Sequence, residues 1–253
     1  IGFLRETVGD QLHAYPAPIL TYLKLNCAQP YLSDPRVRRA LSLGLDRAFL
    51  NTHFFNGEAQ SSDTVIPRHG DAYTPPRPDP DAARALLAEA GFTAQSPLRL
   101  TVRATAGDRD RLAIAILDDW SRIGVEGELL ASYPLDLYQA VDAGDFDVAL
   151  ARFDRGLKSD PDFMLQPFSR NGFADNTNWS GAARESFDAL MADAYAMIDP
   201  EERAVQFRRA ETIFLEAMPN IPLVHERAYW LISDRTRAPE DIQPQLWRDL
   251  ELR

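Results

Sequence analysis

Apolar residues recur along this chain with two different spacings, which predict two kinds of element. Large apolar and polar residues alternate over residues 19–26 and 98–103, as in half-buried strands. A spacing of three and four, typical of amphipathic helices, runs through residues 109–123, 183–198 and 199–218. Strands and helices therefore follow one another along the chain, an order typical of α/β proteins.

Proline and glycine mark where the predicted helices begin and end. Asp34-Pro35, Asp79-Pro80 and Asp199-Pro200 each combine an N-cap acceptor with a proline preset for the first helical turn. Asn56-Gly57 supplies the left-handed turn that ends a helix. The two long helices near the carboxyl end are expected to bury one apolar face each, formed by Phe187, Leu190, Met191, Ala194 and Ile198 and by Val205, Phe207, Ala210, Ile213, Phe214 and Ala217.

The remaining segments are less regular. Residues 58–78 are rich in proline and are expected to form a long surface loop that contains a solvated His69. Trp120 belongs to an apolar stripe that is complete without any function, which favours a core position. The tail, residues 234–253, is charged and is expected to be loop with one short element near Trp247.

Residues 146–163 (FDVALARFDRGLKSDPDF) contain the clearest passage from core to polar loop. Phe146, Val148 and Leu150 alternate as a short buried strand, and a glycine-containing loop with both signs of charge follows. Loops at the carboxyl ends of sheet strands often hold ligands in α/β proteins. An ordinary solvated surface loop explains the same residues, so the pattern alone leaves both interpretations open.

Composition and charge narrow the class of partner. The chain has 253 residues, 45% of them hydrophobic, and 27 Lys and Arg against 38 Asp and Glu, for a net charge of −11. This balance predicts a folded globular protein and disfavours binding to nucleic acid or to an anionic membrane. Cys27 is the single cysteine, which excludes an internal disulfide.

The sequence contains no recognisable catalytic or metal-binding motif. A nucleophile elbow, a phosphate-binding glycine loop and a carboxylate pair at fixed spacing are all missing. The four histidines, at positions 13, 53, 69 and 225, form no pair at metal-ligand spacing. We therefore expect a protein that is not an enzyme and that has no metal and no cofactor.

Short segments spread over nearly the whole chain resemble the extracellular solute-binding proteins of ABC transporters, family 5, the dipeptide-, oligopeptide- and nickel-binding group. Each segment is weak by itself, but together they follow the family's order. They are residues 22–26 (YLKLN), 34–41 (DPRVRRAL), 45–47 (LDR), 79–92 (DPDAARALLAEAGF), Trp120 with 123–125 (IGV), 146–147 (FD), 160–161 (DP), Asn178, 199–203 (DPEER) and 219–223 (PNIPL).

The resemblance implies one lobe of a type II periplasmic-binding-protein fold, with a mixed sheet flanked by helices, α/β (α+β) in class. Members of the family are about twice as long and have two lobes. The expected division is a remnant of the first lobe at residues 1–18, the second, ligand-binding lobe with its crossover strands at 19–226, and the return crossover and tail of the first lobe at 227–253. A first lobe of the same protein is therefore an expected partner.

Function follows from the same resemblance. It implies a periplasmic receptor that closes two lobes on a peptide or similarly sized polar solute and delivers it to a membrane permease. The alternative is the sensor domain of a cytoplasmic transcription regulator, since the same binding fold also occurs behind DNA-binding domains.

The resemblance also implies candidate ligand-binding residues. In peptide-binding relatives an arginine at the end of the strand matched by residues 98–103 pairs with the ligand carboxylate, and Arg103 stands there. A surface position in which Arg103 pairs with Asp108 or Asp110 is the other interpretation.

The loop after residue 152 departs from the family pattern. Relatives that bind a peptide amino terminus carry a Trp and then an Asp, whereas Phe153 stands nearest the Trp and no acid stands at the second place. Asp154 replaces that acid only if the loop folds back. The basic residues fit a ligand that is anionic or lacks an amino terminus, and the full set of candidates is Arg103, Arg152, Phe153, Asp154, Arg155 and Lys158.

Overall fold

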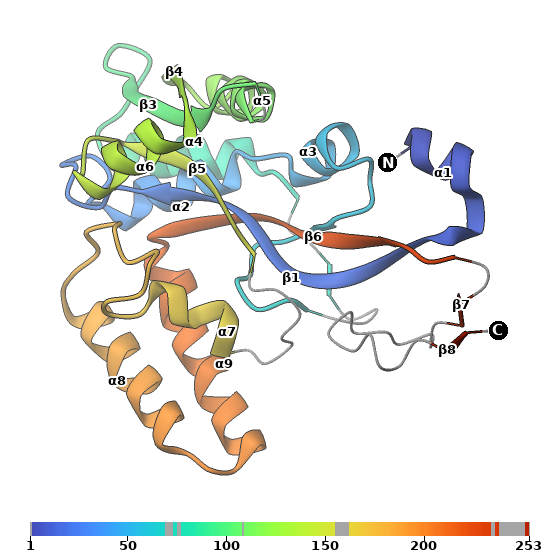
Figure 1. Cartoon of the computed structure of the whole chain (residues 1–253). Helices are drawn as coiled ribbons and strands as arrows, with labels where there is room; N and C mark the ends of the chain where they lie inside the picture. Colours follow the sequence, from blue (N-terminus) through green and yellow to red (C-terminus); the bar gives the residue numbers. More distant parts are fainter. Residues whose placement is uncertain are drawn as a thin grey trace.

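One mixed sheet organises the protein, of which the computed structural model describes residues 2–68, 73–74, 77–107, 109–154, 162–233, 236–237 and 251–252. Its strand order is β2-β6-β1-β5-β3-β4 (Figure 1). β3 is parallel to β4 and β5, whereas β1 is antiparallel to β5 and β6. The strands are β1 (Leu12–Leu25), β2 (Gln60–Ser61), β3 (Leu98–Thr105), β4 (Val125–Ser132), β5 (Val148–Asp154) and β6 (Asn220–Leu231).

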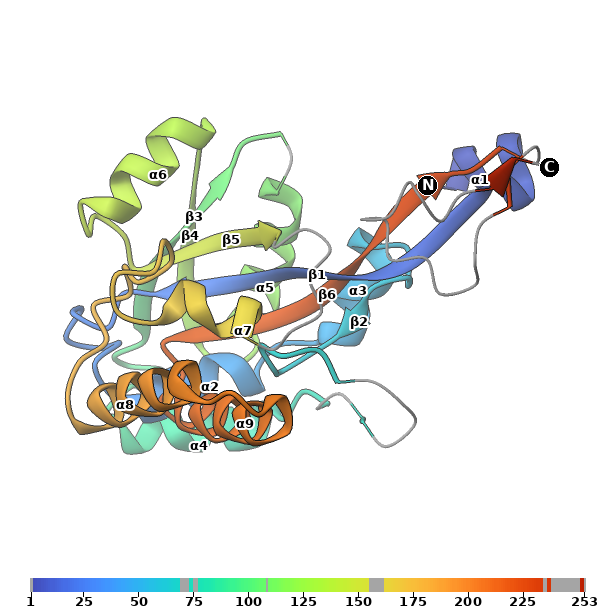
Figure 2. The same ribbon diagram turned by 60° about the horizontal axis from the view of Figure 1, so that its bottom comes forward.

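Helices cover both faces of this sheet, so the predicted mixed sheet flanked by helices is confirmed (Figure 2). One face packs against α2 (Pro35–Leu43), α3 (Arg47–Phe54), α4 (Pro80–Glu89) and α5 (Asp110–Ser121). The other packs against α6 (Pro134–Asp142), α7 (Asp162–Leu165) with the 3-10 turn η2 (Gln166–Phe168), α8 (Ala182–Ala196) and α9 (Pro200–Ala217). None of the helices in the described part of the chain is long and apolar enough to cross a membrane.

The three Asp-Pro pairs begin helices as predicted. Asp34 accepts a hydrogen bond from the amide of Arg36, Asp79 from that of Ala82, and Asp199 from those of Glu201 and Glu202. Each carboxylate thus satisfies amides that the first helical turn leaves unpaired. The caps fix where α2, α4 and α9 start.

The α2–α5 face carries the larger apolar core. Trp120 is fully buried in it, as predicted, and its indole Nε1 donates to the carbonyl of Leu41 at 2.9 Å. Two arginines of the DPRVRRAL and LDR segments are buried at its margin. Arg38 donates to the carbonyl of Ala217, the last residue of α9, and so pairs an acceptor that the helix end leaves free.

Arg47 joins three separate backbone segments. Its Nε donates to the carbonyls of Ser62 and Pro222 at 3.1 and 2.9 Å, and its terminal nitrogens donate to the carbonyl and hydroxyl of Ser42. Burial lowers the pKa of Arg47 to about 10, and Asp63 and Tyr73 act in the opposite direction. Arg47 of the LDR segment therefore has a structural role.

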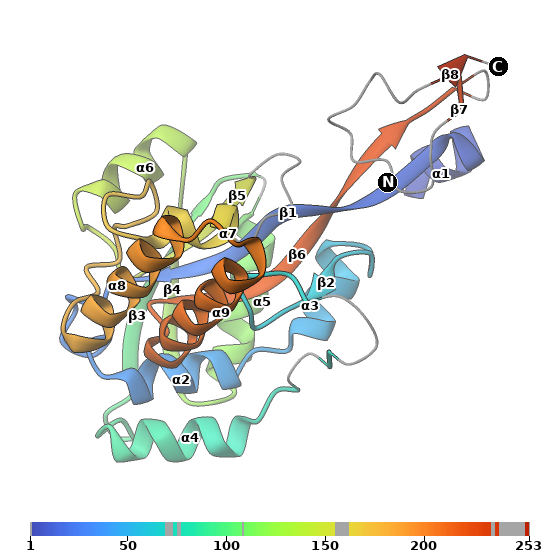
Figure 3. The same cartoon turned by 90° about the horizontal axis from the view of Figure 1, so that it is seen from below.

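The other face of the sheet is rich in aromatic side chains. The helices α8 and α9 lie side by side on this face (Figure 3). Phe168, Phe187 and Phe214 are buried in the core that these helices form with the sheet. The prediction was wrong for two residues of these helices, since Ile198 is 95% exposed and Val205 is 46% exposed. Ile198 lies past the last residue of α8, at the tip of the α8–α9 hairpin, whereas Val205 lies on the face of α9 opposite to Phe207, Ala210 and Phe214.

β1 and β6 continue past the helices as a two-stranded ribbon, formed by residues 12–16 and 227–231 (Figure 1). Its far end carries α1 (Gly2–Val8), η1 (Gly9–Gln11), β7 (Thr236–Arg237) and β8 (Glu251–Leu252). Arg5 of α1 pairs with Glu58 at 2.8 Å, and the Tyr229 hydroxyl donates to the same carboxylate. Burial and this hydrogen bond raise the pKa of Tyr229 to about 12.

The ribbon makes β1 longer than the sequence indicates, because the prolines at 16 and 18 obscure its first half. The apolar segments at 221–226 and 228–233 are likewise one continuous strand over most of their length. The element expected near Trp247 and the solvated His69 lie outside the described residues.

The first prediction concerns Arg47. Arg47→Met removes the donor and leaves buried carbonyls without a partner, so we expect the free energy of unfolding to fall by about 3 kcal/mol or more. Arg39→Met, at an exposed position of the preceding helix, is the control and should change it by less than about 0.5 kcal/mol. Urea unfolding measures both, and equal midpoints for the two variants would contradict the structural role of Arg47.

A buried lysine gives the fold a defined pH dependence. The Lys24 ammonium donates to Asn176 Oδ1 at 2.6 Å. Burial lowers the pKa of Lys24 to about 8, although the Asp142 carboxylate acts in the opposite direction. Between this value and the ordinary pKa of lysine, the unfolded chain holds a proton that the folded chain has lost. Stability therefore rises with pH in that window.

We expect the wild-type chain to gain about 2–3 kcal/mol of unfolding free energy relative to Lys24→Met as the pH rises from 8 to 10.5. Other titrating groups are shared by the two proteins and cancel in the difference. Urea unfolding at several pH values measures it. A difference that stays constant over this range would show that Lys24 keeps its ordinary pKa.

Candidate functional site

The carboxyl ends of β3 and β5 meet at the edge of the sheet where the ribbon begins. β3 ends at Thr105 and β5 at Asp154, and Asp154 lies opposite Ile19 of β1. α5 starts a few residues after β3, so its amino-terminal end faces the same edge. Ligands of α/β proteins bind at such edges, where loops follow parallel strands.

Two arginines and a glutamate come together at this edge. Arg152 Nε of β5 lies 3.2 Å from both carboxylate oxygens of Glu226 in β6. One terminal nitrogen of Arg109 lies 3.9 Å from Glu226 Oε1. The side chain of Arg152 is 33% exposed, that of Arg109 17% and that of Glu226 19%. All three are therefore partly buried but still reach the surface.

Two more residues complete this group. The buried Thr21 hydroxyl donates to Glu226 Oε1 at 2.5 Å and accepts from Arg109 at 3.1 Å. Asp154 Oδ2 lies 3.6 Å from a terminal nitrogen of Arg152. We call these five residues the edge cluster: Thr21, Arg109, Arg152, Asp154 and Glu226. Its two positive and two negative charges balance.

Arg152 and Asp154, both candidates from the sequence, therefore lie in the same cluster of side chains. Arg155 and Lys158, predicted with them, lie outside the described residues. The position of Arg152 follows from strand alternation, because Val148 and Leu150 point into the α2–α5 core and Arg152 continues their face.

Arg103 points to the opposite face of the sheet. Leu100 and Val102 alternate with it and pack on the α2–α5 side. Its Nε donates to the carbonyl of Asp145 and a terminal nitrogen to the Asp145 carboxylate, both at 2.7 Å. The arginine fork is thus held by Asp145. Asp108, one of the partners considered from sequence, lies outside the described residues.

Phe153 is a core residue in this structure. Its ring is 4% exposed and meets Tyr22 and Phe168 edge to face at 5.7 and 5.5 Å between ring centres. The exposed ring beside it is Phe173, at 6.2 Å and 60% exposed.

Sequence reasoning did not single out Thr21, Arg109 or Glu226 as functional. Arg109 was only the start of a helix, and the other two belong to strands 205 residues apart. One available signal was that Arg152 and Glu226 each stand near the carboxyl end of an apolar run. Their pairing depends on β1 lying between β5 and β6, an order that alternation cannot predict.

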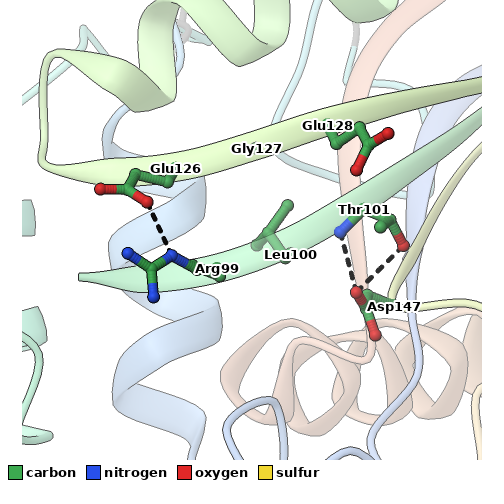
Figure 4. A pocket seen from close by; sticks show the side chains of 7 residues that line it. All are labelled: Arg99, Leu100, Thr101, Glu126, Gly127, Glu128 and Asp147. Atoms are coloured by element: carbon green, nitrogen blue, oxygen red, sulfur yellow. Dashed lines mark hydrogen bonds and ion pairs between the residues drawn. The ribbon is translucent and has the colours of Figure 1, made fainter. Parts of the chain in front are cut away.

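A depression of about 320 Å³ lies near the amino ends of β3 and β4, away from the edge cluster (Figure 4). Arg99 and Glu126 pair at 2.7 Å on one side of it. On the other side Asp147 accepts from the amide and hydroxyl of Thr101, at 2.8 and 3.0 Å, and from the Tyr31 hydroxyl at 2.6 Å. Because its carboxylate is already satisfied, Asp147 serves to join β5, β3 and the segment before α2.

Comparison with known proteins identifies relatives of this chain. The chain is 26% identical over 227 residues to the heme-binding protein A of Haemophilus influenzae, which covers 87% of this chain and 41% of the relative. It is 29% identical over 227 residues to the periplasmic oligopeptide-binding protein OppA of Escherichia coli, covering 82% and 40%. The chain thus spans about two fifths of the length of these curated relatives.

A solved structure shares the fold. The murein tripeptide binding protein MppA of Escherichia coli superposes with a TM-score of 0.79 at 22% identity, covering 99% of this chain and 51% of that one. These three relatives are named for binding heme, oligopeptides and a murein tripeptide, and none of them is named as a transcription regulator. The profile of the bacterial extracellular solute-binding proteins, family 5 Middle, matches residues 3–176. The chain therefore belongs to the family 5 extracellular solute-binding proteins, as its sequence segments indicated.

Proposed function

We propose that this chain is the second lobe of a periplasmic receptor that captures a peptide or similarly sized polar solute and delivers it to an ABC permease. The family description and the peptide-binding names of relatives support this proposal. A family of solute-binding proteins also supports a role without catalysis. The proposed partners are the solute, the permease and a first lobe of the same protein.

The division into lobes is part of the proposal. Residues 19–226 form the sheet and its helices, whereas residues 1–18 and 227–253 belong to the first lobe. The ribbon supports this division, because two antiparallel strands leave the body side by side and carry the chain ends away from it. Coverage of about half of the solved relative is consistent with one lobe of two.

The observation that carries a ligand assignment is the pair of partly buried arginines, Arg152 and Arg109, at the carboxyl edge of the parallel strands. A guanidinium fork binds a carboxylate with two parallel hydrogen bonds, and partial burial strengthens the pair. We therefore propose a ligand that presents a carboxylate, such as the carboxyl terminus of a peptide. Arg155 and Lys158 are proposed to add positive charge from the loop that follows.

The first test compares Ala-Ala-Ala with its carboxyl-terminal amide by calorimetry on the full-length gene product. We expect the wild-type protein to bind the acid more tightly than the amide. Arg152→Ala should weaken binding of the acid by about tenfold or more and change binding of the amide little. Arg103→Ala is the matched control, because Asp145 holds Arg103 on the other face.

If Arg103→Ala abolishes the preference and Arg152→Ala does not, the carboxylate site lies at Arg103, as the family resemblance implied. Absence of binding by either tripeptide to the wild-type protein would remove the peptide assignment.

The isolated 253-residue chain should bind weakly. A single lobe offers about half of the contacts of a closed cleft, and affinity falls steeply with lost contacts. We expect no binding of Ala-Ala-Ala tighter than about 1 µM to this chain in calorimetry. Submicromolar binding would contradict the two-lobe arrangement.

A further inference from the structure

The pairing of β1 with β6 breaks where the ribbon enters the body. Pro16 lies opposite Arg227, but the next pair is Leu20 with His225, so residues 17–19 face the single residue Glu226. Prolines at 16 and 18 have no amide hydrogen to donate, which explains why the ladder cannot continue through this stretch. An interruption of this kind bends a strand pair and disrupts the ladder of hydrogen bonds locally.

Side-chain contacts of Glu226 hold the chain at this break. Its carboxylate accepts from Thr21 of β1 and Arg152 of β5, and it lies near Arg109 at the start of α5. Three elements, β1, β5 and the start of α5, therefore contact β6 at Glu226. Beyond it, the contacts that support the ribbon include the pairing of its own two strands and those of Glu58 with Arg5 and Tyr229.

Glu226 also occupies one of the two donor edges of Arg152 that a ligand carboxylate could bind. Arg152 Nε is shared between both Glu226 oxygens, and a terminal nitrogen of Arg152 lies 3.6 Å from Asp154. A carboxylate that binds the Nε edge of Arg152 in a bidentate way must displace Glu226, whereas one that binds the two terminal nitrogens meets Asp154 instead. At the Nε edge, the contact that braces the break and the contact that a ligand would replace are thus the same ion pair.

We propose that Glu226 is an internal competitor of the ligand carboxylate and that its release from Arg152 frees the break at residues 17–19 to bend. Ligand charge is then coupled directly to movement of the ribbon relative to the body. This inference rests on the proposed function and deepens it, because it assigns a residue to specificity for anionic ligands and to closure of the lobes.

The test uses Glu226→Gln in the full-length gene product. Glutamine keeps the shape and can still accept from Thr21, but it no longer carries the charge that competes for Arg152. Glu126→Gln is the matched control, since the Arg99–Glu126 pair belongs to the same sheet and lies away from the edge cluster. Calorimetry measures the affinities for Ala-Ala-Ala and for its carboxyl-terminal amide. Small-angle X-ray scattering measures the radius of gyration of the ligand-free protein.

We expect Glu226→Gln to increase the preference for the acid over the amide by about tenfold. We also expect it to decrease the radius of gyration of the ligand-free protein, because the variant imitates the released state. Glu126→Gln should match the wild type in both measurements. An unchanged preference, equal weakening of both tripeptides, or an unchanged radius of gyration each overturns the proposal.

Failure of the proposed function gives a different result. If the wild-type protein binds neither tripeptide, the ligand assignment fails, and the radius of gyration of Glu226→Gln alone decides whether Glu226 holds the break.

Discussion

The antiparallel pairing of β1 with β6 is the constraint on which the rest of the structure depends. These two strands lie at the middle of the sheet, so each apolar core is completed only when they are in register. Leu23 and Leu25 of β1 face the α2–α5 side, whereas Leu20 and Tyr22 face the aromatic side. A shift of one residue would exchange these faces and expose both cores. The same two strands extend past the helices as the ribbon, so the ribbon and the core share one continuous pair of strands.

Buried arginines hold the turns around this sheet. Arg38 pairs the last carbonyl of α9, and Arg47 joins the end of α2, the segment after β2 and β6 through neutral carbonyls. A buried guanidinium is tolerated when its donors are satisfied, and its geometry then fixes several backbone segments at once. Arg38 and Arg47 of the most recognisable segment of the chain, DPRVRRAL followed by LDR, therefore have structural roles away from the edge cluster.

Local sequence predicted much of the fold because caps and alternation act over a few residues. Asp34, Asp79 and Asp199 begin helices wherever the surroundings place them, and Trp120 is buried because its whole stripe is apolar. Periodicity failed at Ile198, since it records which face of a helix is apolar but not how far the helix extends past the sheet.

The site was harder to predict than the fold. Arg152 was found because it continues a buried strand, but its partner Glu226 depends on the order of strands in the sheet. The partner of Arg103 was missed for a similar reason. Asp145 precedes β5, and it reaches Arg103 because β5 lies beside β3, a pairing between segments 42 residues apart.

The two arginines of the edge cluster are opposite in sign to the net charge of the whole chain. With 38 acids and 27 basic residues, the protein repels an anion at long range, although salt screens that effect beyond about 10 Å. In the proposed site, a carboxylate is favoured where it touches Arg152 and Arg109, inside a group whose own charges balance. An ammonium group on the same ligand is attracted by the negative net charge of the chain. On the proposed assignment, the protein favours solutes that carry both charges over simple anions, because the negative net charge attracts the ammonium group and the two arginines bind the carboxylate.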